Sequence, residues 1–260
     1  MAVHPSALID GSAVLGDGVE VGPFSIVGPN VTLGDGVRLG AQVVIQQDTT
    51  IGARPRVSPF AVLGGDPQHM GYKGEPVRVE IGSDCVIREN VTVNRGTAGG
   101  GGLTRVGDRV LLMNNAHVGH DVFVGDDTVL ATSATIGGHA VIGSRVFMGG
   151  LSAVHQFGRV GDGAIVGGLA AVTRDVIPYG SVWGNHARLQ GLNLVGLKRK
   201  GYGKVEIRAL LAAYRDLFEG EGVFEERLER VAATTELPEI QQIVAFIREG
   251  GRRPLCLPEA

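Results

Sequence analysis

The chain has 260 residues, of which 43% are hydrophobic but only 5% are aromatic, and it contains 42 glycines. Globular cores normally rely on large aromatic side chains, so this composition predicts a thin interior of small aliphatic residues and many tight turns. The net charge of −3 argues against binding to nucleic acid or to an anionic membrane, and two distant cysteines, Cys85 and Cys256, do not indicate a disulfide framework.

The first residues, MAVHPSALID, contain neither the basic region nor the apolar region of a secretory signal. No apolar run in the chain reaches the length of a transmembrane helix. We therefore expect a cytoplasmic protein without stable membrane insertion.

An aliphatic residue recurs every six positions and organises most of the chain. Eleven such positions run without a miss from residue 3 to residue 63, three more stand at 81, 87 and 93, and twelve run from 106 to 172. The residue four places after an aliphatic is again small or aliphatic in most repeats, and glycine often follows the aliphatic directly. Two segments break the period, residues 64–80 and 98–105, and we expect both to be inserted loops.

A period of six fits neither an α-helix nor a plain hairpin strand. It fits short parallel strands joined by corners, because the two apolar positions of each repeat then face the same side. This pattern resembles the left-handed parallel β-helix of hexapeptide-repeat acyltransferases, which has three strands and eighteen residues per coil. The 26 positions would make almost nine coils, a stack of roughly 43 Å at about 4.8 Å per coil.

The pattern becomes helical from about Leu189. Residues 204–218 place apolar side chains on one stripe, and two further helical segments follow at 223–235 and 238–250, the last with Pro238 at its first position and Gly250 after its end. We expect residues 1–188 to form the β-helix and residues 189–260 to form a C-terminal α-helical domain that covers its open end.

Two histidines three residues apart, His117 and His120, could be surface residues, metal ligands or bases. Because corner positions repeat every eighteen residues, His120 should stack with Gly138 and Gln156, and these lie next to Asp121, His139 and His155. The predicted column gathers these groups within about 10 Å along one outer edge. A solvated corner is the simple alternative for any single histidine, but the cluster favours a functional site.

Several motifs carry a closer resemblance. The segments LMNNAHVGHDVFVG, GEPVRVEIG, IRENVTVNRGT, GGGLTRVG, SAVHQFGRVG, GNHA and GLKRKG are similar, in this order, to the UDP-N-acetylglucosamine O-acyltransferase family. That family moves a β-hydroxyacyl chain from acyl carrier protein to the 3-hydroxyl of UDP-N-acetylglucosamine, the first step of lipid A biosynthesis. The resemblance implies an enzyme without a cofactor or metal, since the acyl group arrives on the phosphopantetheine arm of acyl carrier protein.

The resemblance also assigns roles. His120 would be the general base, Asp121 would orient its ring, and Gly138 would offer a backbone N–H to the oxyanion. Transfer would be direct, without a nucleophilic serine or cysteine. Gly168 would mark the far end of the acyl groove, where a glycine leaves room for a long chain. The remaining substrate-binding residues would be Gln68, Lys73, His117, His139, His155, Gln156, His186, Asn193, Arg199 and Lys200.

Three residues depart from the family pattern: His69 stands where aspartate is usual, Gly71 where lysine is usual, and Val195 where glutamate is usual. The first two put the sugar contacts of the loop at 64–80 in question. The run of four glycines at 99–102 lacks the other parts of a phosphate-binding loop, so we expect a flexible insertion there.

The family packs three β-helices side by side, which implies a homotrimer with active sites between subunits. We expect Val86, Leu111, Val129 and Val141 to form one outward apolar face for this contact.

Other functions stay open at this point. A metal enzyme resembling the γ-type carbonic anhydrases could use His117, His120 and His139 as ligands, and a purely structural solenoid is also conceivable. The N-acyltransferase of the same pathway is a third alternative, although its family has an additional domain before the repeats. The sequence does not distinguish a 3-hydroxyl from a 3-amino acceptor.

Overall fold

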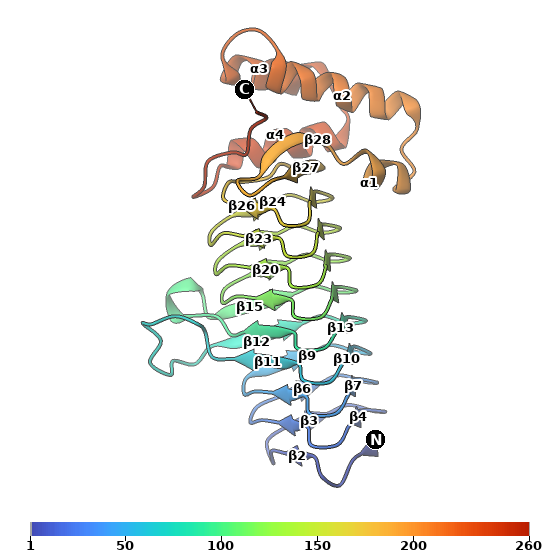
Figure 1. Ribbon diagram of the computed structural model, residues 1–260, viewed down its shortest axis with the longest axis vertical. Coiled ribbons are helices and arrows are strands. Elements are labelled where there is room, and N and C mark those ends of the chain that lie inside the picture. Colours follow the sequence, from blue (N-terminus) through green and yellow to red (C-terminus); the bar gives the residue numbers. More distant parts are fainter. Residues whose placement is uncertain (1, 260) are drawn as a thin grey trace.

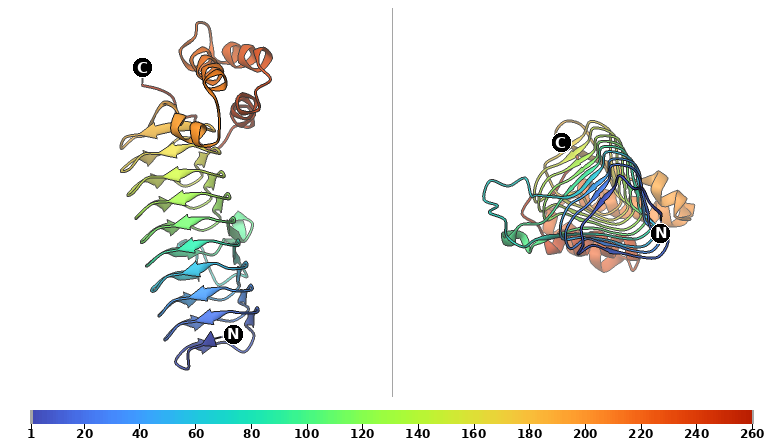
Figure 2. Two further views of the ribbon diagram at one scale, coloured as in Figure 1. Left: turned by 90° about the vertical axis from the view of Figure 1, so that its right-hand side faces the viewer. Right: turned by 90° about the horizontal axis from the view of Figure 1, so that it is seen from below.

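The computed structural model describes residues 2–259, so Met1 and Ala260, the outer bounds of the two predicted domains, lie outside it. Short parallel strands stack in coils along one axis, and α-helices lie at the C-terminal end of the stack (Figure 1). Seen along the axis, the coils form a triangle (Figure 2). Each of the strands β1 to β26 contains one of the 26 aliphatic positions of the six-residue repeat, so the predicted repeat is confirmed.

Three sheets form the faces of the triangular stack, and we name them A, B and C. Sheet A consists of β1 (Ala2–Val3), β4 (Glu20–Val21), β7 (Arg38–Leu39), β10 (Arg56–Val57), β13 (Val86–Ile87), β16 (Leu111–Leu112), β19 (Val129–Leu130), β22 (Phe147–Met148), β25 (Ile165–Val166), β27 (Gly180–Trp183) and β28 (Arg188–Leu192). Sheet B consists of β2 (Leu8–Ile9), β5 (Ile26–Val27), β8 (Val44–Ile45), β11 (Val62–Gly65), β14 (Thr92–Asn94), β17 (His117–Val118), β20 (Thr135–Ile136), β23 (Ala153–Val154) and β26 (Ala171–Val172). Sheet C consists of β3 (Val14–Leu15), β6 (Thr32–Leu33), β9 (Thr49–Ile51), β12 (Arg78–Ile81), β15 (Leu103–Val106), β18 (Phe123–Val124), β21 (Val141–Ile142) and β24 (Arg159–Val160).

Most strands have two residues, one pointing inward and one outward, because side chains alternate along a strand. The inward residues, such as Leu33, Ile45 and Ile136, are fully buried, and the interior is a single column of aliphatic side chains. Cys85 lies in this column, and burial raises the pKa of its thiol to about 11. The thin aliphatic core predicted from the composition is confirmed.

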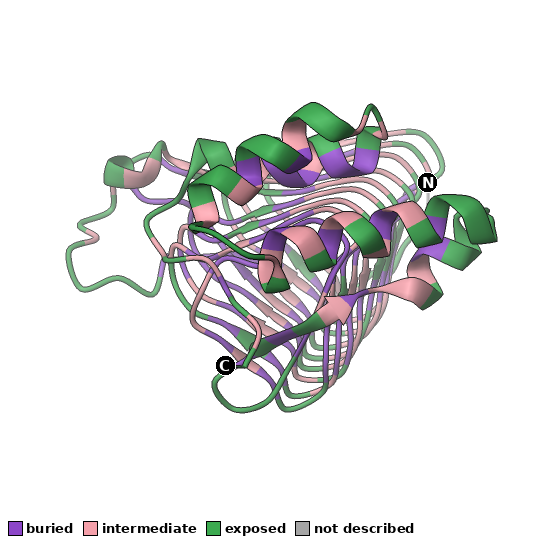
Figure 3. Ribbon diagram, turned by 90° about the horizontal axis from the view of Figure 1, so that it is seen from above, coloured by how far each residue is buried: buried purple, intermediate pink, exposed green. Residues whose placement is uncertain are grey.

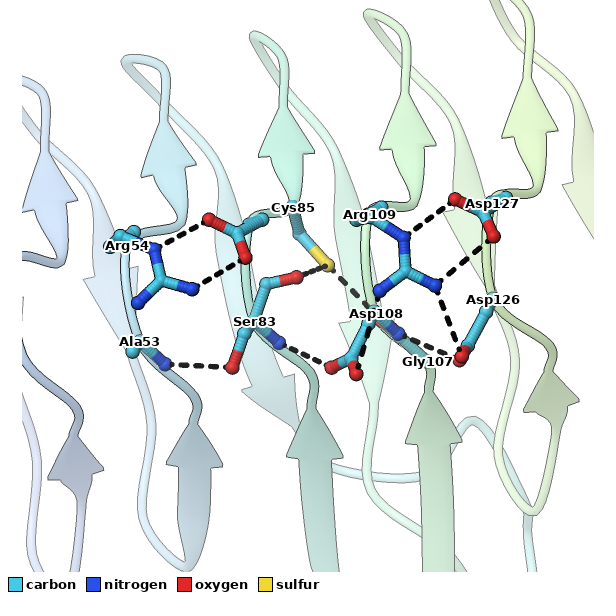
Figure 4. Close-up of polar contacts among 10 residues, drawn as sticks. Ala53, Arg54, Ser83, Cys85, Gly107, Asp108, Arg109, Asp126 and Asp127 are labelled. Carbon is cyan, nitrogen blue, oxygen red and sulfur yellow. Dashed lines mark hydrogen bonds and ion pairs between the residues drawn. The ribbon is translucent and has the colours of Figure 1, made fainter.

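The corner between sheets C and A shows how successive coils satisfy their backbone groups (Figure 4). The amide of Ala53 donates to Ser83 Oγ at 3.1 Å, and the amide of Ser83 donates to Asp108 Oδ1 at 2.7 Å. The amide of Asp108 then donates to Asp126 Oδ1 at 3.0 Å. A polar side chain at this corner therefore accepts a hydrogen bond from a backbone N–H group of the preceding coil, which the short strands leave without a partner.

Both interruptions of the repeat leave the stack at the same corner, between sheets B and C. The first loop joins β11 to β12 and the second joins β14 to β15, and both project on one side of the molecule (Figure 1). The second loop contains a 3₁₀ turn, Ala98–Gly100. Arg95, which is fully buried, donates to the Gly64 carbonyl and pairs with Asp66, so it ties the two loops together.

The helical cap consists of α1 (Leu194–Arg199), α2 (Lys204–Glu219), α3 (Phe224–Thr234) and α4 (Pro238–Glu249). Their buried residues belong to the same hydrophobic cluster as the last coils, and the helices lie over the end of the stack (Figure 3). Pro238 begins α4 and Gly250 follows its end, as predicted. The first helix begins later than the expected Leu189, because β28 pairs with β27 as an antiparallel hairpin. The domain boundary at residue 188 stays a prediction. Within residues 2–259, no helix combines the length and apolarity needed to cross a bilayer.

The chain after α4 returns to the β-helix and packs against its last coil. The amide of Asp175 donates to the Pro254 carbonyl at 2.9 Å, and the amide of Cys256 donates to the Asp175 carbonyl at 2.7 Å. The Cys256 side chain is buried. We call residues 250–257 the C-terminal strap.

The expected apolar face is only partly right. Val86, Leu111 and Val129 lie in register on sheet A, followed by Phe147, but Val141 belongs to sheet C. Val141 follows Val129 by twelve residues, which is two strands rather than a full coil, so it lies on a different face.

Candidate active site

The histidine column lies at the corner between sheets B and C, where both inserted loops also leave the stack. The amide of His139 donates to the His120 carbonyl at 2.9 Å, and the amide of Phe157 donates to the Gly138 carbonyl at 3.0 Å. These bonds stack three consecutive coils, as the eighteen-residue spacing predicts. The loops lie on the N-terminal side of the column, and the C-terminal strap lies on its other side (Figure 1). The segments added to the regular coils therefore gather at this corner.

His120 and Asp121 form a buried pair. His120 Nδ1 lies 2.8 Å from Asp121 Oδ2, and the two residues are 8% and 4% exposed. A carboxylate can only accept a hydrogen bond, so Nδ1 carries the proton of the neutral ring and Nε2 keeps its lone pair. His120 Nε2 is thereby prepared to accept a proton.

Asp121 is held in place by the second inserted loop. Thr97 donates to it twice, from its amide at 2.8 Å and from Oγ1 at 2.7 Å. A β-carbon on Gly100 would collide with the Asp121 carboxylate, so the glycine run follows the acid closely. The glycine run therefore forms one wall of the site, whereas the sequence predicted a flexible insertion. Sequence reasoning missed Thr97 and Gly100 because the insertion hides their place in the eighteen-residue count.

Gly138 lies directly against the His120 ring. A β-carbon at residue 138 would come within 2.6 Å of His120 Cε1 and Nε2, so any other residue would displace the imidazole. This gives glycine a steric role at residue 138. The backbone N–H of Gly138 has no hydrogen-bond acceptor among residues 2–259, which leaves it available to a ligand.

His139 packs between aromatic neighbours. Its ring stacks on Phe157 at a centroid distance of 4.6 Å and meets the His120 ring edge-on at 4.9 Å. Partial burial lowers the pKa of His139 below its ordinary value; the Asp121 carboxylate opposes this shift, and the Arg252 cation adds to it. His139 is therefore neutral at pH 7 and can act as a hydrogen-bond donor and acceptor.

A pocket of about 670 Å³ opens beside this cluster. His69, Gly71 and Tyr72 of the first loop form one side, and Thr97 and Gly100 of the second loop form another. The column and the strap complete it with Asp121, His139, Phe157 and Arg252. The volume and the many polar groups suit a sugar-sized ligand.

His69 lies next to the predicted base, although the sequence marked it only as a departure. Its ring meets the His120 ring edge-on at 5.6 Å, and its Nδ1 accepts a hydrogen bond from the Gly71 amide at 3.1 Å. A β-carbon at residue 71 would come within 2.9 Å of His69 Cε1. The departures at 69 and 71 are thus physically linked, because the histidine ring needs the space that glycine leaves.

Four predicted residues lie outside the pocket lining: three of them are near the column, and the fourth, Gly168, is not. His117 lies on the outer face of sheet B, bonded through Nδ1 to Thr92 Oγ1 at 2.7 Å, and burial lowers its pKa. His155 and Gln156 belong to the coil that follows Gly138 and His139, and they contact the strap residue Arg253. Gly168 lies at the opposite edge of sheet B, at the corner with sheet A.

The other predicted binding residues are not among those that line this pocket. Gln68 and Lys73 are exposed on the first loop, and His186 is exposed in the turn between β27 and β28. Asn193, Arg199 and Lys200 line a second pocket of about 750 Å³ on the side of sheet A, together with Phe147 and Trp183. Sheet A is the face opposite the histidine corner. Within one chain, Asn193, Arg199 and Lys200 therefore line a different pocket from the one beside the histidine column.

The structure also bears on the metal alternative. Among residues 2–259, the side chains that converge closely enough to share an ion are His120, Asp121 and His139, and not the predicted set with His117. His117 is bonded to Thr92 instead. Asp121 already accepts hydrogen bonds from Thr97 and His120, and an ion at Asp121 would have to replace them. The arrangement suits an oriented base better than a metal ligand set.

Comparisons with known proteins give the class first. Residues 12–47 match the bacterial transferase hexapeptide family, described as six repeats. Residues 175–256 match the family described as Udp N-acetylglucosamine O-acyltransferase, domain 2. Together these matches define a transferase built of hexapeptide repeats with the helical domain of one particular group.

Individual relatives name that group. The chain is 54% identical over 257 residues to the acyl-[acyl-carrier-protein]–UDP-N-acetylglucosamine O-acyltransferase of Azorhizobium caulinodans, covering 98% of this chain and 95% of the relative. It is 58% identical over 204 residues to the Caulobacter vibrioides protein of the same name, covering 78% of each chain. The chain belongs to the acyl-[acyl-carrier-protein]–UDP-N-acetylglucosamine O-acyltransferase family.

Solved structures agree with this assignment. LpxA from Acinetobacter baumannii superimposes with a TM-score of 0.95 at 34% identity, covering 98% of this chain and all of that one. UDP-N-acetylglucosamine O-acyltransferase from Moraxella catarrhalis gives a TM-score of 0.94 at 40% identity, covering 98% and 99%. The predicted left-handed parallel β-helix with a C-terminal helical domain is confirmed.

Proposed function

We propose that this protein transfers a β-hydroxyacyl chain from acyl carrier protein to the 3-hydroxyl of UDP-N-acetylglucosamine, the first step of lipid A biosynthesis. The names of the relatives support the substrates. The observation that carries the chemistry is the buried His120–Asp121 pair, which leaves Nε2 without a proton beside a sugar-sized pocket. An acyltransferase to a hydroxyl requires such a base, because the hydroxyl must lose its proton as it attacks.

The proposed reaction is a direct transfer. His120 Nε2 takes the proton of the sugar hydroxyl while the oxygen attacks the thioester carbonyl, and Asp121 stabilises the imidazolium. The Gly138 N–H donates to the oxyanion of the tetrahedral intermediate. Collapse breaks the carbon–sulfur bond, and the thiolate of the phosphopantetheine arm receives the proton from His120. No protein nucleophile, metal or additional cofactor enters this scheme.

The proposed substrate site extends beyond these groups. His139 is a neutral hydrogen-bonding residue beside the base, with its ring centroid 4.9 Å from that of His120. Gly168 limits the acyl groove. The other proposed contacts are Gln68, Lys73, His117, His155, Gln156, His186, Asn193, Arg199 and Lys200.

We also propose a homotrimer. Sheet A exposes Val86 and Phe147 in one line, with Leu111, Val129 and Ile165 partly exposed between and beyond them. If this face packs on the histidine corner of a neighbouring subunit, the two pockets of different chains come together. The trimer would therefore unite the two groups of predicted substrate residues that one chain keeps apart. A cytoplasmic location and the absence of nucleic acid partners stay predictions.

The decisive experiment identifies the product. Purified protein is incubated with UDP-N-acetylglucosamine, or with its 3-amino analogue, and with β-hydroxyacyl carrier proteins of different lengths, and products are analysed by mass spectrometry. We expect an ester of UDP-N-acetylglucosamine. If only the 3-amino analogue is acylated, giving a base-stable amide, the acceptor is an amine and not the 3-hydroxyl. No acyl transfer to either sugar nucleotide would contradict the proposal.

A further inference from the structure

The C-terminal strap reaches the histidine corner from the cap side. It is fixed to the last coil by the reciprocal backbone bonds of Asp175 with Pro254 and Cys256. A β-carbon on Gly251 would collide with the Asp175 carboxylate and come within 2.7 Å of Arg159 Nε, so the strap approaches that ion pair as closely as a backbone can. A segment fixed this firmly presents its side chains in a defined geometry.

Two consecutive arginines of the strap point to the column. The Arg252 guanidinium lies over the Phe157 ring, 4.6 Å from its centroid, and lines the pocket beside the histidine column. Arg253 is partly buried and contacts the residues just before Phe157. Its terminal nitrogen lies 2.7 Å from His155 Nδ1, and its Nε donates to the Gln156 carbonyl at 3.1 Å.

These contacts determine where the His155 ring carries its proton. A guanidinium has only donors, so His155 Nδ1 must be the acceptor in the bond with Arg253. The proton of the neutral ring is then on Nε2, which has no hydrogen-bond partner among residues 2–259. His155 consequently offers an N–H donor at Nε2.

The position of the His155 proton depends on Arg253, because both side chains lie within reach of the Gln156 carbonyl. His155 Nδ1 lies 3.3 Å from the same carbonyl oxygen to which Arg253 donates. With Arg253 present, the carbonyl has its donor and Nδ1 accepts from a charged group at the shorter distance of 2.7 Å. Without Arg253, Nδ1–H would donate to the free carbonyl, and Nε2 would change from a donor to an acceptor.

We propose that Arg253 is a positioning residue of the acyltransferase site, which holds His155 as the Nε2–H tautomer so that it donates to an oxygen of the sugar nucleotide. This rests on the proposed substrate contact of His155. Phosphate and carbonyl oxygens of a nucleoside diphosphate sugar can only accept, so against either of them the wrong tautomer would place two acceptors against each other.

The tautomer can be measured without activity. Protein labelled with ¹⁵N-histidine is compared by long-range ¹H–¹⁵N NMR at pH 8.5, where neutral imidazoles predominate, and His155→Gln assigns the signal. We expect the Nε2–H form in the wild type and the Nδ1–H form in Arg253→Met, which keeps an unbranched side chain but has no donor. The same tautomer in both proteins, or Nδ1–H in the wild type, would overturn the proposal.

Kinetics then test the role of the tautomer. Loss of one hydrogen bond should raise KM for UDP-N-acetylglucosamine by about 5- to 10-fold in Arg253→Met and change kcat much less, and Arg253→Lys should recover part of the loss. Arg248→Met is the matched control, because it removes an arginine that pairs with Glu229 within the cap. Protection of the buried Cys256 thiol from alkylation shows whether the strap stays docked in each variant.

The outcomes separate the inference from the proposed function. If His155→Ala raises KM but Arg253→Met flips the tautomer without raising it, Arg253 has no positioning role. If neither variant changes KM, His155 does not contact the substrate, and that part of the proposed function fails together with the inference. A tautomer change, a raised KM and a protected Cys256 in Arg253→Met support the proposal.

Discussion

The chemistry of single residues in this site depends on what their neighbours donate or accept. His120 Nδ1 is engaged by Asp121, so the free nitrogen of His120 is the basic one. His155 Nδ1 is engaged by Arg253, so its free nitrogen is a donor. Two histidines of one column therefore have opposite tautomers, which the residue type alone cannot indicate.

The first prediction concerns His120. His120→Ala should lower kcat by about two to four orders of magnitude, because the attacking hydroxyl loses its base, and substrate binding should be largely kept. His117→Ala is the control and should cost less, since Thr92 already occupies one of its ring nitrogens. Steady-state kinetics of both variants make the measurement. A His120→Ala enzyme with near-native turnover would refute the mechanism.

His139 provides a prediction on pH. Burial lowers its pKa in the folded state, so the folded protein binds this proton less readily than the unfolded chain. The NMR titration of His139 should have a midpoint below 6.5, and Arg252→Met should raise it because a nearby cation is removed. Through linkage, His139 should reduce folding stability as pH falls below about 6.5. A midpoint above 6.5 in the wild type would contradict this assignment.

At the scale of elements, the inserted loops and the corners supply what the regular coils cannot. The two loops hold Asp121 and place His69 beside His120, and the coils hold the column in register. Loops on a rigid scaffold commonly carry binding residues in this way.

The role of the first loop can be tested at Gly71, which departs from the family pattern together with His69. Gly71→Lys restores the lysine usual in the family, but its β-carbon would displace the His69 ring. We expect kcat/KM to fall by about 10- to 100-fold, as for other misplaced site groups. Met70→Lys adds the same charge at a fully exposed neighbour and should have little effect. An increase in activity for Gly71→Lys would show that His69 is not needed in its present position.

The corner between sheets A and B carries the prediction on acyl length. Gly168 leaves open space, and a β-carbon there would come within 3.3 Å of the Gly150 carbonyl oxygen, a contact that a small shift relieves. Each buried methylene of the acyl chain is worth about 0.8 kcal/mol, so an open groove should favour a long β-hydroxyacyl donor. The measurement compares kcat/KM for donors of about ten and about fourteen carbons in the wild type and in Gly168→Met. An unchanged preference in Gly168→Met would show that Gly168 does not determine the length of the acyl chain.

The whole molecule is a three-faced prism in which the histidine corner and the second pocket lie on opposite sides. One chain therefore presents an incomplete set of the predicted substrate residues at either place. The apolar line on sheet A makes association of subunits the simplest way to complete the site.

Assembly is the last prediction. Sedimentation at assay concentration should give three times the chain mass of 27.1 kDa. Phe147→Asp places a charge in the apolar line of sheet A and should reduce both the trimer and the activity. Val14→Asp, on an exposed position of sheet C near the N-terminus, is the control and should leave both unchanged. An active monomer would contradict the shared site.

The sequence alone determined the coils. Because each repeat contributes one inward aliphatic, the six-residue period identified the strands β1 to β26, and the eighteen-residue spacing placed His120 with Gly138 and His139. Local patterns also predicted the last helix, with Pro238 and Gly250 at its ends. These features depend on neighbours within one or two coils or one helix.

Only the tertiary structure decided what surrounds the column. The insertions interrupt the count of eighteen, so the sequence could not show that Thr97, Gly100 and His69 meet at one corner. Arg253 is 98 residues away from His155, and no periodicity connects the two. Repeats determine contacts at a fixed separation along the chain, whereas loops and a returning terminus depend on the folding of the whole chain. The site combines both, and for that reason its base was predictable and its surroundings were not.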